Sequence, residues 1–117
     1  MSFVRRKDDA VFEEKNMFGA PGMAKHRKLL NAPEEMLGKG RLFNHVILNP
    51  GCGIGWHVHS GDSETFYVLK GEAEYNDNGS VTTIKAGDIT NVLPGEGHSA
   101  MNNGTEPVEI IALILYA

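Results

Sequence analysis

Two histidines and a glutamate lie close together in the middle of the chain. His57 and His59 are separated by one residue, and Glu64 follows after a short polar segment. In a β-strand successive side chains point to opposite faces, so His57 and His59 project to the same side, about 6.6 Å apart along the backbone. Two imidazoles placed in this way can bind one ion, and Glu64 can supply an oxygen from the next strand. This stretch alone predicts half of a metal site.

The segments that must position these residues are short and rich in β-forming residues. They are separated by Gly, Pro, Asn and Asp, which favour tight turns, and the chain contains 14 glycines. Eight short strands predict a barrel or a sandwich, and 117 residues suit one domain with one hydrophobic core. The eight runs lie at residues 42–49, 54–60, 65–70, 72–75, 80–85, 88–93, 98–102 and 108–116.

The first 40 residues differ in character from the rest. Residues 1–41 carry 9 Lys and Arg against 6 Asp and Glu, whereas residues 42–117 carry 2 against 9. We interpret residues 1–40 as a basic N-terminal arm and residues 41–117 as the barrel. Near residues 31–38 a capping asparagine, an early proline and a closing glycine predict one short helix. The apolar loop at residues 17–23 is either a lid at a pocket mouth or a segment held by ordinary burial.

A second set of residues makes the first more specific. Nine positions match two motifs, G-x5-H-x-H-x3–4-E-x6-G and G-x5-P-x-G-x2-H-x3-N, with one departure, Pro94 in place of a proline at position 93. The matched residues are Gly51, His57, His59, Glu64, Gly71, Gly87, Gly95, His98 and Asn102. On these motifs the chain resembles the cupin family. The resemblance implies an all-β, double-stranded β-helix or jelly-roll barrel, in which His57, His59, Glu64 and His98 line the interior and bind one metal ion.

The donor set that the resemblance implies restricts the metal. Three neutral imidazoles and one carboxylate suit a divalent transition metal such as Mn, Fe, Ni, Co, Cu or Zn, and not a calcium-type site made only of oxygens. In an octahedral site two positions stay open, and the ion with one glutamate keeps a net positive charge that favours an anionic, bidentate ligand. The alternative is a metal-free barrel in which the same residues are a polar lining.

Three further residues are candidates for the pocket or for contacts behind the metal. Phe43 and His45 share one strand face, and they line the pocket if that face points inward; with the opposite parity His45 lies on the outer surface. Asn102 is in phase with His98 and either orients a ligand or is required by the following turn. His26, in the basic arm, has no evident partner. The sequence does not identify a catalytic residue.

Two classes of function are compatible with the sequence. The first is a metal-dependent enzyme of decarboxylase, dioxygenase or isomerase type that acts on a small carboxylated, keto or hydroxylated compound. The second is a non-catalytic protein that binds a sugar or an organic acid. A barrel with a complete ligand set and no attached helix-turn-helix segment favours the enzyme. Both classes imply a small-molecule ligand, anionic or polyhydroxylated.

Charge and hydrophobicity indicate the other partners and the compartment. The net charge is −4 and the basic clusters lack interleaved aromatics, so nucleic acid is not an expected partner. No apolar run approaches the roughly 20 residues that span a bilayer, and no signal-peptide core is visible, so we expect no membrane partner and a cytoplasmic location. The nearly all-apolar run at residues 108–116 is expected to be buried on both faces or to lie at a subunit interface, and we expect a homodimer.

Overall fold

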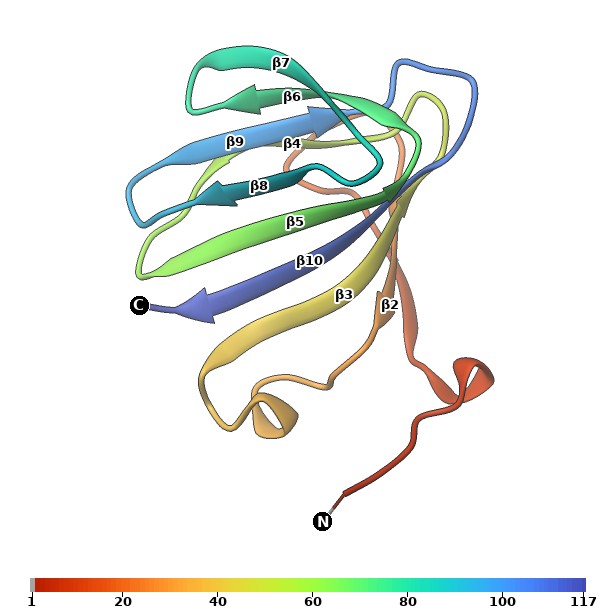
Figure 1. Ribbon diagram of the computed structural model, residues 1–117, viewed down its shortest axis with the longest axis vertical. Coiled ribbons are helices and arrows are strands. Elements are labelled where there is room, and N and C mark those ends of the chain that lie inside the picture. The colour runs from red at the N-terminus through yellow and green to blue at the C-terminus, as the bar shows by residue number, and fades with distance from the viewer. Residues whose placement is uncertain (1) are drawn as a thin grey trace.

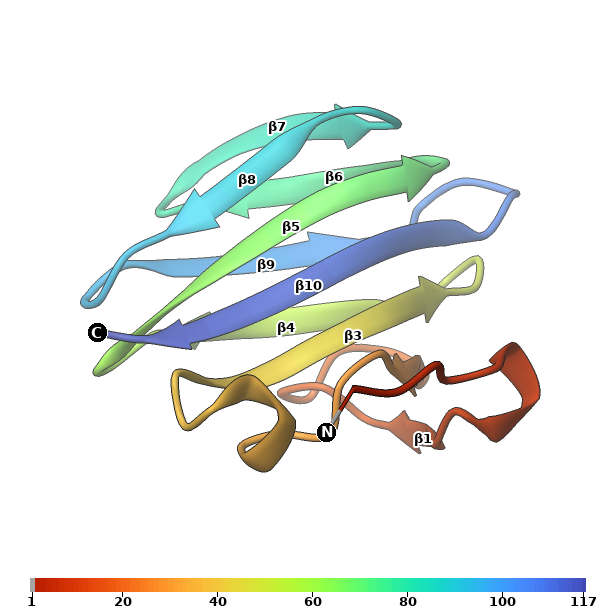
Figure 2. The same ribbon diagram turned by 60° about the horizontal axis from the view of Figure 1, so that its bottom comes forward.

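Two antiparallel β-sheets packed against each other form the body of the computed structural model, which describes residues 2–117 (Figures 1 and 2). The six-stranded sheet has the order β1 (Phe12–Lys15), β2 (Ala24–Lys28), β3 (Gly40–Leu48), β10 (Val108–Tyr116), β5 (Asp62–Lys70), β8 (Ile89–Val92). The four-stranded sheet has the order β4 (Gly53–Val58), β9 (Gly97–Met101), β6 (Glu72–Asp77), β7 (Ser80–Lys85).

The eight strands from β3 to β10 have the strand order of a jelly roll. One sheet contains β3, β10, β5 and β8 in spatial order, and the other contains β4, β9, β6 and β7. The first barrel strand therefore lies beside the eighth and the third beside the sixth, while the second lies beside the seventh and the fourth beside the fifth. The predicted all-β jelly-roll fold is confirmed, and each of the eight predicted runs corresponds to one of these strands.

The N-terminal residues contribute more to the sheet than the sequence predicted. β1 and β2 pair with each other, and β2 pairs with β3, so this hairpin extends the six-stranded sheet. The prediction of a plain arm missed both strands because they are short and strongly charged, FEEK and AKHRK. The predicted short helix is a single 3₁₀ turn at Glu34–Met36, and a similar turn lies at Lys7–Asp9. No helix within residues 2–117 is long and apolar enough to cross a membrane.

The hydrophobic core lies between the two sheets. β10 runs between β3 and β5, and its alternate residues Val108, Ile110, Ala112 and Ile114 are buried. The intervening residues of β10 face outward and are only partly covered. The apolar run at residues 108–116 is therefore buried on its inner face, while its outer face belongs to the surface of the chain.

Two Pro-Gly turns fix the backbone on either side of the histidine strands. The N–H of Cys52 donates to the carbonyl of Asn49 (2.9 Å), and Gly51 has φ of 82°. In the same way the N–H of Glu96 donates to the carbonyl of Leu93 (3.0 Å), and Gly95 has φ of 90°. A type II turn places proline second and a residue with positive φ third, which glycine adopts without strain. Pro94 therefore forms the turn that leads into β9, and the departure from the motif leaves the approach to His98 intact.

Candidate metal centre

Four side chains from both sheets meet inside the barrel. His57 lies on β4, His59 directly follows that strand, Glu64 lies on β5, and His98 lies on β9. The antiparallel register places His57 opposite His98. His59, Glu64 and His98 are almost completely buried, and one donor atom from each of the four residues lies within 4.8 Å of all the others. The structure thus brings together the residues predicted as metal ligands.

The separations between the donor atoms suit a single ion. The Nε2 atom of His98 lies 3.1 Å from Nε2 of His57 and 3.3 Å from Nε2 of His59. Oε1 of Glu64 lies 2.9, 3.2 and 3.6 Å from Nε2 of His98, His59 and His57, respectively. A transition metal with bonds of about 2.0–2.2 Å holds neighbouring donors about 3.0–3.5 Å apart. The four residues therefore could hold a metal ion without a large rearrangement.

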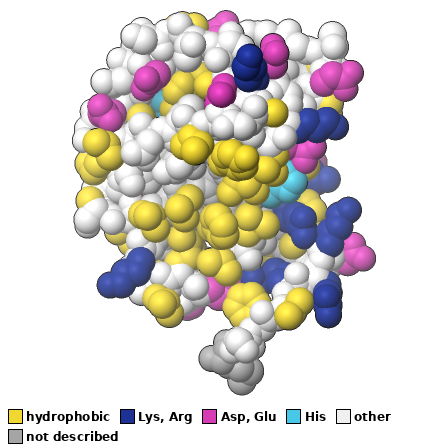
Figure 3. All heavy atoms as spheres, in the orientation of Figure 1, with side chains coloured by type: hydrophobic (Ala, Val, Ile, Leu, Met, Phe, Trp, Pro, Cys, Tyr) yellow, Lys and Arg dark blue, Asp and Glu magenta, His cyan; other side chains and the backbone are white. Residues whose placement is uncertain are grey.

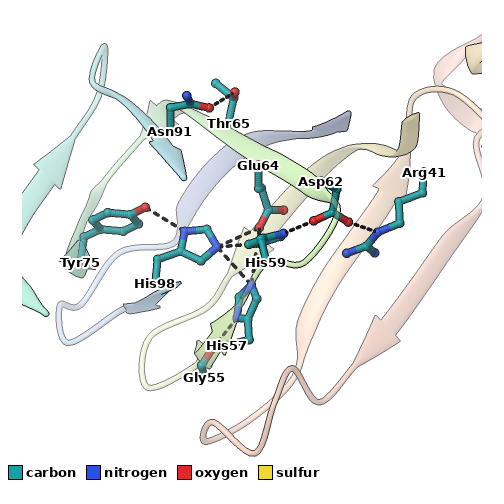
Figure 4. A network of polar contacts seen from close by, with 10 residues as sticks. All are labelled: Arg41, Gly55, His57, His59, Asp62, Glu64, Thr65, Tyr75, Asn91 and His98. Carbon is teal, nitrogen blue, oxygen red and sulfur yellow. Dashed lines mark hydrogen bonds and ion pairs between the residues drawn. The ribbon is translucent and has the colours of Figure 1, made fainter. Parts of the chain in front are cut away.

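The opposite edge of each imidazole is held by the protein (Figure 4). When Nδ1 of a histidine is occupied by such a contact, the ring is oriented and Nε2 remains for a metal. All three histidines have this arrangement. Nδ1 of His57 lies 2.8 Å from the carbonyl of Gly55, Nδ1 of His59 lies 2.7 Å from Oδ1 of Asp62, and Nδ1 of His98 lies 2.8 Å from the hydroxyl of Tyr75. Asp62 is itself fixed by Arg41, whose Nε donates to Oδ2 at 2.7 Å.

Burial and hydrogen bonds within the cluster shift the pKa values of its members in different directions. Burial alone would raise the pKa of Glu64, but hydrogen bonds from the three histidines outweigh burial and hold that pKa far below its usual range. The pKa of His59 is raised, chiefly by its hydrogen bond to Glu64, against the effect of burial and with help from Asp62. Burial lowers the pKa of His98 although Glu64 opposes the shift. Glu64 is thus ionised, and His98 is neutral, as ligation requires.

A small cavity adjoins the four donors. The space open to the centre of a water-sized sphere is about 50 Å³. About 10–15 Å³ of such space accommodates one water molecule, so the cavity holds a few waters or one small ligand. The aromatic ring of Phe18 stacks on His57, with ring centroids 4.0 Å apart. Around the donors the lining is mostly apolar and consists of Met17, Phe18, His26, Arg41, Leu42, Val46, Ile54, Phe66, Ala112 and Ile114.

Comparison with known proteins identifies the family. The profile of the Cupin domain family, Cupin_2, matches residues 44–114. The chain belongs to the cupin family. This cupin is 41% identical over 100 residues to a protein of Thermotoga maritima described as an oxalate-binding protein, a match that spans 86% of this chain and 82% of the relative.

Two solved structures resemble this cupin over almost its whole length. One, from Thermotoga maritima, is described as a predicted oxalate decarboxylase; it has a TM-score of 0.92 and 38% identity and covers 98% of this chain and 100% of that one. The other is an uncharacterized conserved protein with a double-stranded β-helix domain from Klebsiella pneumoniae, with a TM-score of 0.70, 32% identity, and coverage of 99% and 91%.

Neither of the pocket residues expected on β3 lines the cavity. The residues of β3 that line it are Arg41, Leu42 and Val46. Phe43 and His45 alternate with Leu42 and Val46 along the strand, so they lie on its outer face. His45 instead contacts Glu109 on β10, with 2.8 Å between Nε2 and Oε1. Strand alternation grouped these residues correctly, but the group faces away from the site.

Asn102 has the turn role that the sequence left open. It is completely buried, and its amide donates to the carbonyls of Leu48 (2.9 Å) and Glu106 (2.8 Å) while its Oδ1 accepts from the N–H of Gly104 (2.9 Å). All of these contacts are with backbone, and none is with a residue of the metal cluster. Asn102 therefore fixes the loop between β9 and β10.

Four residues around the site were not predicted from the sequence. Asp62 and Tyr75 orient two of the histidines, and Arg41 and His26 line the cavity. The spacing of Asp62, three residues after His59, was a usable signal, because a carboxylate often supports a metal-bound histidine. Tyr75, Arg41 and His26 reach the site only through strand pairing, so no local spacing indicates them.

Proposed function

We propose that this cupin binds one divalent transition metal ion through His57, His59, Glu64 and His98, and that the bound ion captures a small dicarboxylate of the oxalate type. The observation that carries the proposal is the convergence of the four donors in one small cavity that Arg41 also lines. The 41% identical relative described as an oxalate-binding protein supports the choice of ligand.

The balance of charge makes the metal necessary for such a ligand. Without an ion, the carboxylates of Glu64 and Asp62 lie at the site, and the guanidinium of Arg41 already pairs with Asp62, so the site disfavours a dianion. A divalent ion reverses this balance. Arg41 donates through Nε to Asp62, and within residues 2–117 its Nη1 and Nη2 make no side-chain hydrogen bond. A guanidinium held in this way is suited to a carboxylate oxygen.

The size of the cavity restricts the ligand. About 50 Å³ of water-accessible space beside the donors suits a compound of a few heavy atoms better than a sugar phosphate. The apolar lining excludes water, which strengthens the attraction between the ion and a carboxylate. These features support a small organic acid over the polyhydroxylated alternative.

Oxalate titration of metal-loaded and metal-stripped protein tests this function. We expect calorimetry to give one oxalate per chain for protein loaded with Mn, Co or Zn, and no binding after treatment with a chelator. Arg41→Gln is expected to weaken oxalate binding about 10-fold or more, because it removes a charged hydrogen-bond donor. Arg27→Gln, which changes an arginine that does not line the cavity, is the matched control. Failure of wild-type protein to bind oxalate with any of these metals would overturn the proposal.

Decarboxylation is a second candidate function, favoured by the structural relative described as a predicted oxalate decarboxylase. In that reaction the carbon–carbon bond of oxalate breaks, carbon dioxide leaves and the remaining carbon takes a proton to give formate. A bound divalent ion supplies positive charge that polarises the carboxylate. Incubation with ¹³C-oxalate and detection of labelled formate distinguishes turnover from binding alone, and measurement of oxygen uptake separates decarboxylation from oxidation.

Metal affinity is expected to fall as the pH falls from about 8 to about 6. Protons compete with the ion for His59, and the raised pKa of His59 means that this competition begins above the usual histidine range. The metal-free barrel has the opposite dependence: protonated His59 stabilises it below the unfolded-state pKa, and this stabilisation is lost as the pH rises through the higher folded-state pKa. Chelator competition and thermal melts across this range measure both trends.

Asp62→Asn provides the variant for this pH test. Loss of one carboxylate that raises the pKa of His59 is expected to move the midpoint of the affinity curve to lower pH. Asp77→Asn, at an exposed position on β6, is the control. An affinity that does not change between pH 6 and pH 8 would contradict the role of His59 as a ligand.

We also propose that the outer face of the six-stranded sheet forms a homodimer interface. Figure 3 shows hydrophobic side chains gathered across the middle of this face, over β3, β10 and β5. The half-buried or exposed residues there are Phe43, Ile47, Tyr67, Leu69, Ile111, Leu113 and Leu115. The strand register places Leu113 opposite Phe43 and Ile111 opposite Tyr67, so the patch is continuous across three strands. Contiguous apolar patches of this kind mark interaction sites.

Sedimentation is expected to report a dimer at micromolar concentration. Leu113→Glu places a charge in the middle of the patch and is expected to give a folded monomer, since burial of an unpaired carboxylate at an interface is strongly unfavourable. Val81→Glu makes the same kind of change at an exposed position on β7, in the other sheet, and should leave the dimer intact. A monomeric wild-type protein would rule out this interface.

A further inference from the structure

His26 is a buried histidine on the edge hairpin, away from the four metal donors in sequence. It lies on β2, opposite Val46 of β3, and only 2% of its surface is exposed. Its imidazole lines the same cavity as His59 and Glu64. The β1–β2 hairpin, which the sequence predicted to be a plain arm, therefore contributes a polar side chain to the wall of the binding cavity.

The hydrogen bond at one edge of the ring defines its tautomer. Nδ1 of His26 lies 2.9 Å from Nδ2 of Asn44, and an amide nitrogen can only donate. Nδ1 is therefore the acceptor, and the proton of the neutral ring resides on Nε2. Asn44 also lines a surface pocket together with Lys15 and Lys28, a setting that suits its carbonyl oxygen and leaves its nitrogen to face His26.

The other edge of the ring lacks a partner. Nε2 of His26 is buried and makes no hydrogen bond with any group in residues 2–117. A buried donor without an acceptor is costly and uncommon in native proteins. Burial lowers the pKa of His26, with Lys15 as the next contribution in the same direction, so the ring stays neutral and retains only this one N–H. An acceptor brought into the cavity would satisfy it.

We infer that Nε2–H of His26 donates a hydrogen bond to a carboxylate oxygen of the ligand bound in the cavity, and that this residue selects ligands with an acceptor oxygen beyond those held by the ion. The inference rests on the proposed function, because it requires an anion in this cavity. It adds a specificity-determining residue from the β1–β2 hairpin, which lies outside the residues 44–114 matched by the family profile. A dicarboxylate satisfies His26, whereas a monocarboxylate such as acetate leaves it unpaired.

Two substitutions distinguish the effect of the hydrogen-bond donor of His26 from the effect of its ring shape. His26→Phe keeps a planar ring and removes both nitrogens, while His26→Gln keeps an N–H donor near the position of Nε2 and also loses the acceptor for Asn44. Calorimetry on the zinc-loaded protein is expected to show oxalate binding weakened about 10- to 100-fold by His26→Phe and less than about 3-fold by His26→Gln. Acetate binding and zinc affinity, the latter measured by chelator competition, are expected to stay unchanged in both variants.

An NMR measurement on the wild-type protein tests the role of His26 even if a variant does not fold. With ¹⁵N-labelled histidine, the zinc-loaded protein is expected to show His26 protonated at Nε2 and not at Nδ1, and oxalate is expected to shift the Nε2–H proton resonance downfield. Protonation at Nδ1, or oxalate binding that His26→Phe leaves unchanged, would overturn the role of His26 while the proposed function stands. Absence of oxalate binding to wild-type protein would overturn both.

Discussion

Replacement of Glu64 by glutamine is expected to remove nearly all bound metal from the purified protein. The carboxylate lies within 2.9–3.6 Å of all three Nε2 atoms and is the only charged donor in the group. Loss of residues that merely support a ligand already costs about 10- to 100-fold in affinity, so loss of the charged donor is expected to cost about 100-fold or more. Elemental analysis and chelator competition measure the effect.

The barrel itself is expected to survive this change. Glutamine has nearly the same size as glutamate and keeps one acceptor oxygen, so the neighbouring histidines retain a partner. Added metal should raise the melting temperature of the wild-type protein and leave that of Glu64→Gln almost unchanged, because a ligand stabilises only the protein that binds it. Glu72→Gln, at an exposed position on β6, is the matched control. Full metal content in Glu64→Gln would show that the ion is held elsewhere.

The ligand group could be predicted from sequence because its geometry is encoded locally. A period of two places His57 and His59 on one strand face, and Pro-Gly turns lead into β4 and β9, the strands that carry His57 and His98. Only the meeting of the two motifs needed the family resemblance, since His57 and His98 become neighbours through the pairing of β4 with β9. Local spacing indicated His57, His59 and Glu64, the family resemblance added His98, and the topology of the barrel brought the four together.

Strand β3 shows where the rule of alternating side chains fails to predict which residues face the cavity. The strand carries apolar residues on both faces: Leu42 and Val46 inside, Phe43 and Ile47 outside. It also carries a buried polar residue, Asn44, on the inner face. Alternation therefore separates the two sets without indicating which set is inside. The inner position of Asn44 makes sense only with His26, which arrives from a strand that sequence patterns did not reveal.

Replacement of Phe66 by alanine is expected to lower the free energy of unfolding of the metal-free protein by about 3–5 kcal/mol. Phe66 is 2% exposed, stacks on His98 with centroids 5.0 Å apart, and meets Tyr75 edge to face. Its removal leaves a void that β-sheets on both sides cannot easily close. Since a domain of this size has a total stability of about 5–15 kcal/mol, the variant is expected to be marginal. Urea denaturation measures the loss.

Phe3→Ala removes the same side chain from a site that is 53% exposed and is expected to change stability by less than about 1 kcal/mol. A loss below about 1 kcal/mol for Phe66→Ala would contradict its place in the core. Metal affinity provides a second distinction, because Phe66 offers no donor atom to the ion and supports the site by packing against the His98 ring. Phe66→Ala should therefore weaken metal binding less than Glu64→Gln does, although it destabilises the barrel more. If Glu64→Gln has the larger effect on metal affinity and Phe66→Ala has the larger effect on the free energy of unfolding, the two variants distinguish the donors that bind the ion from the packing that supports them.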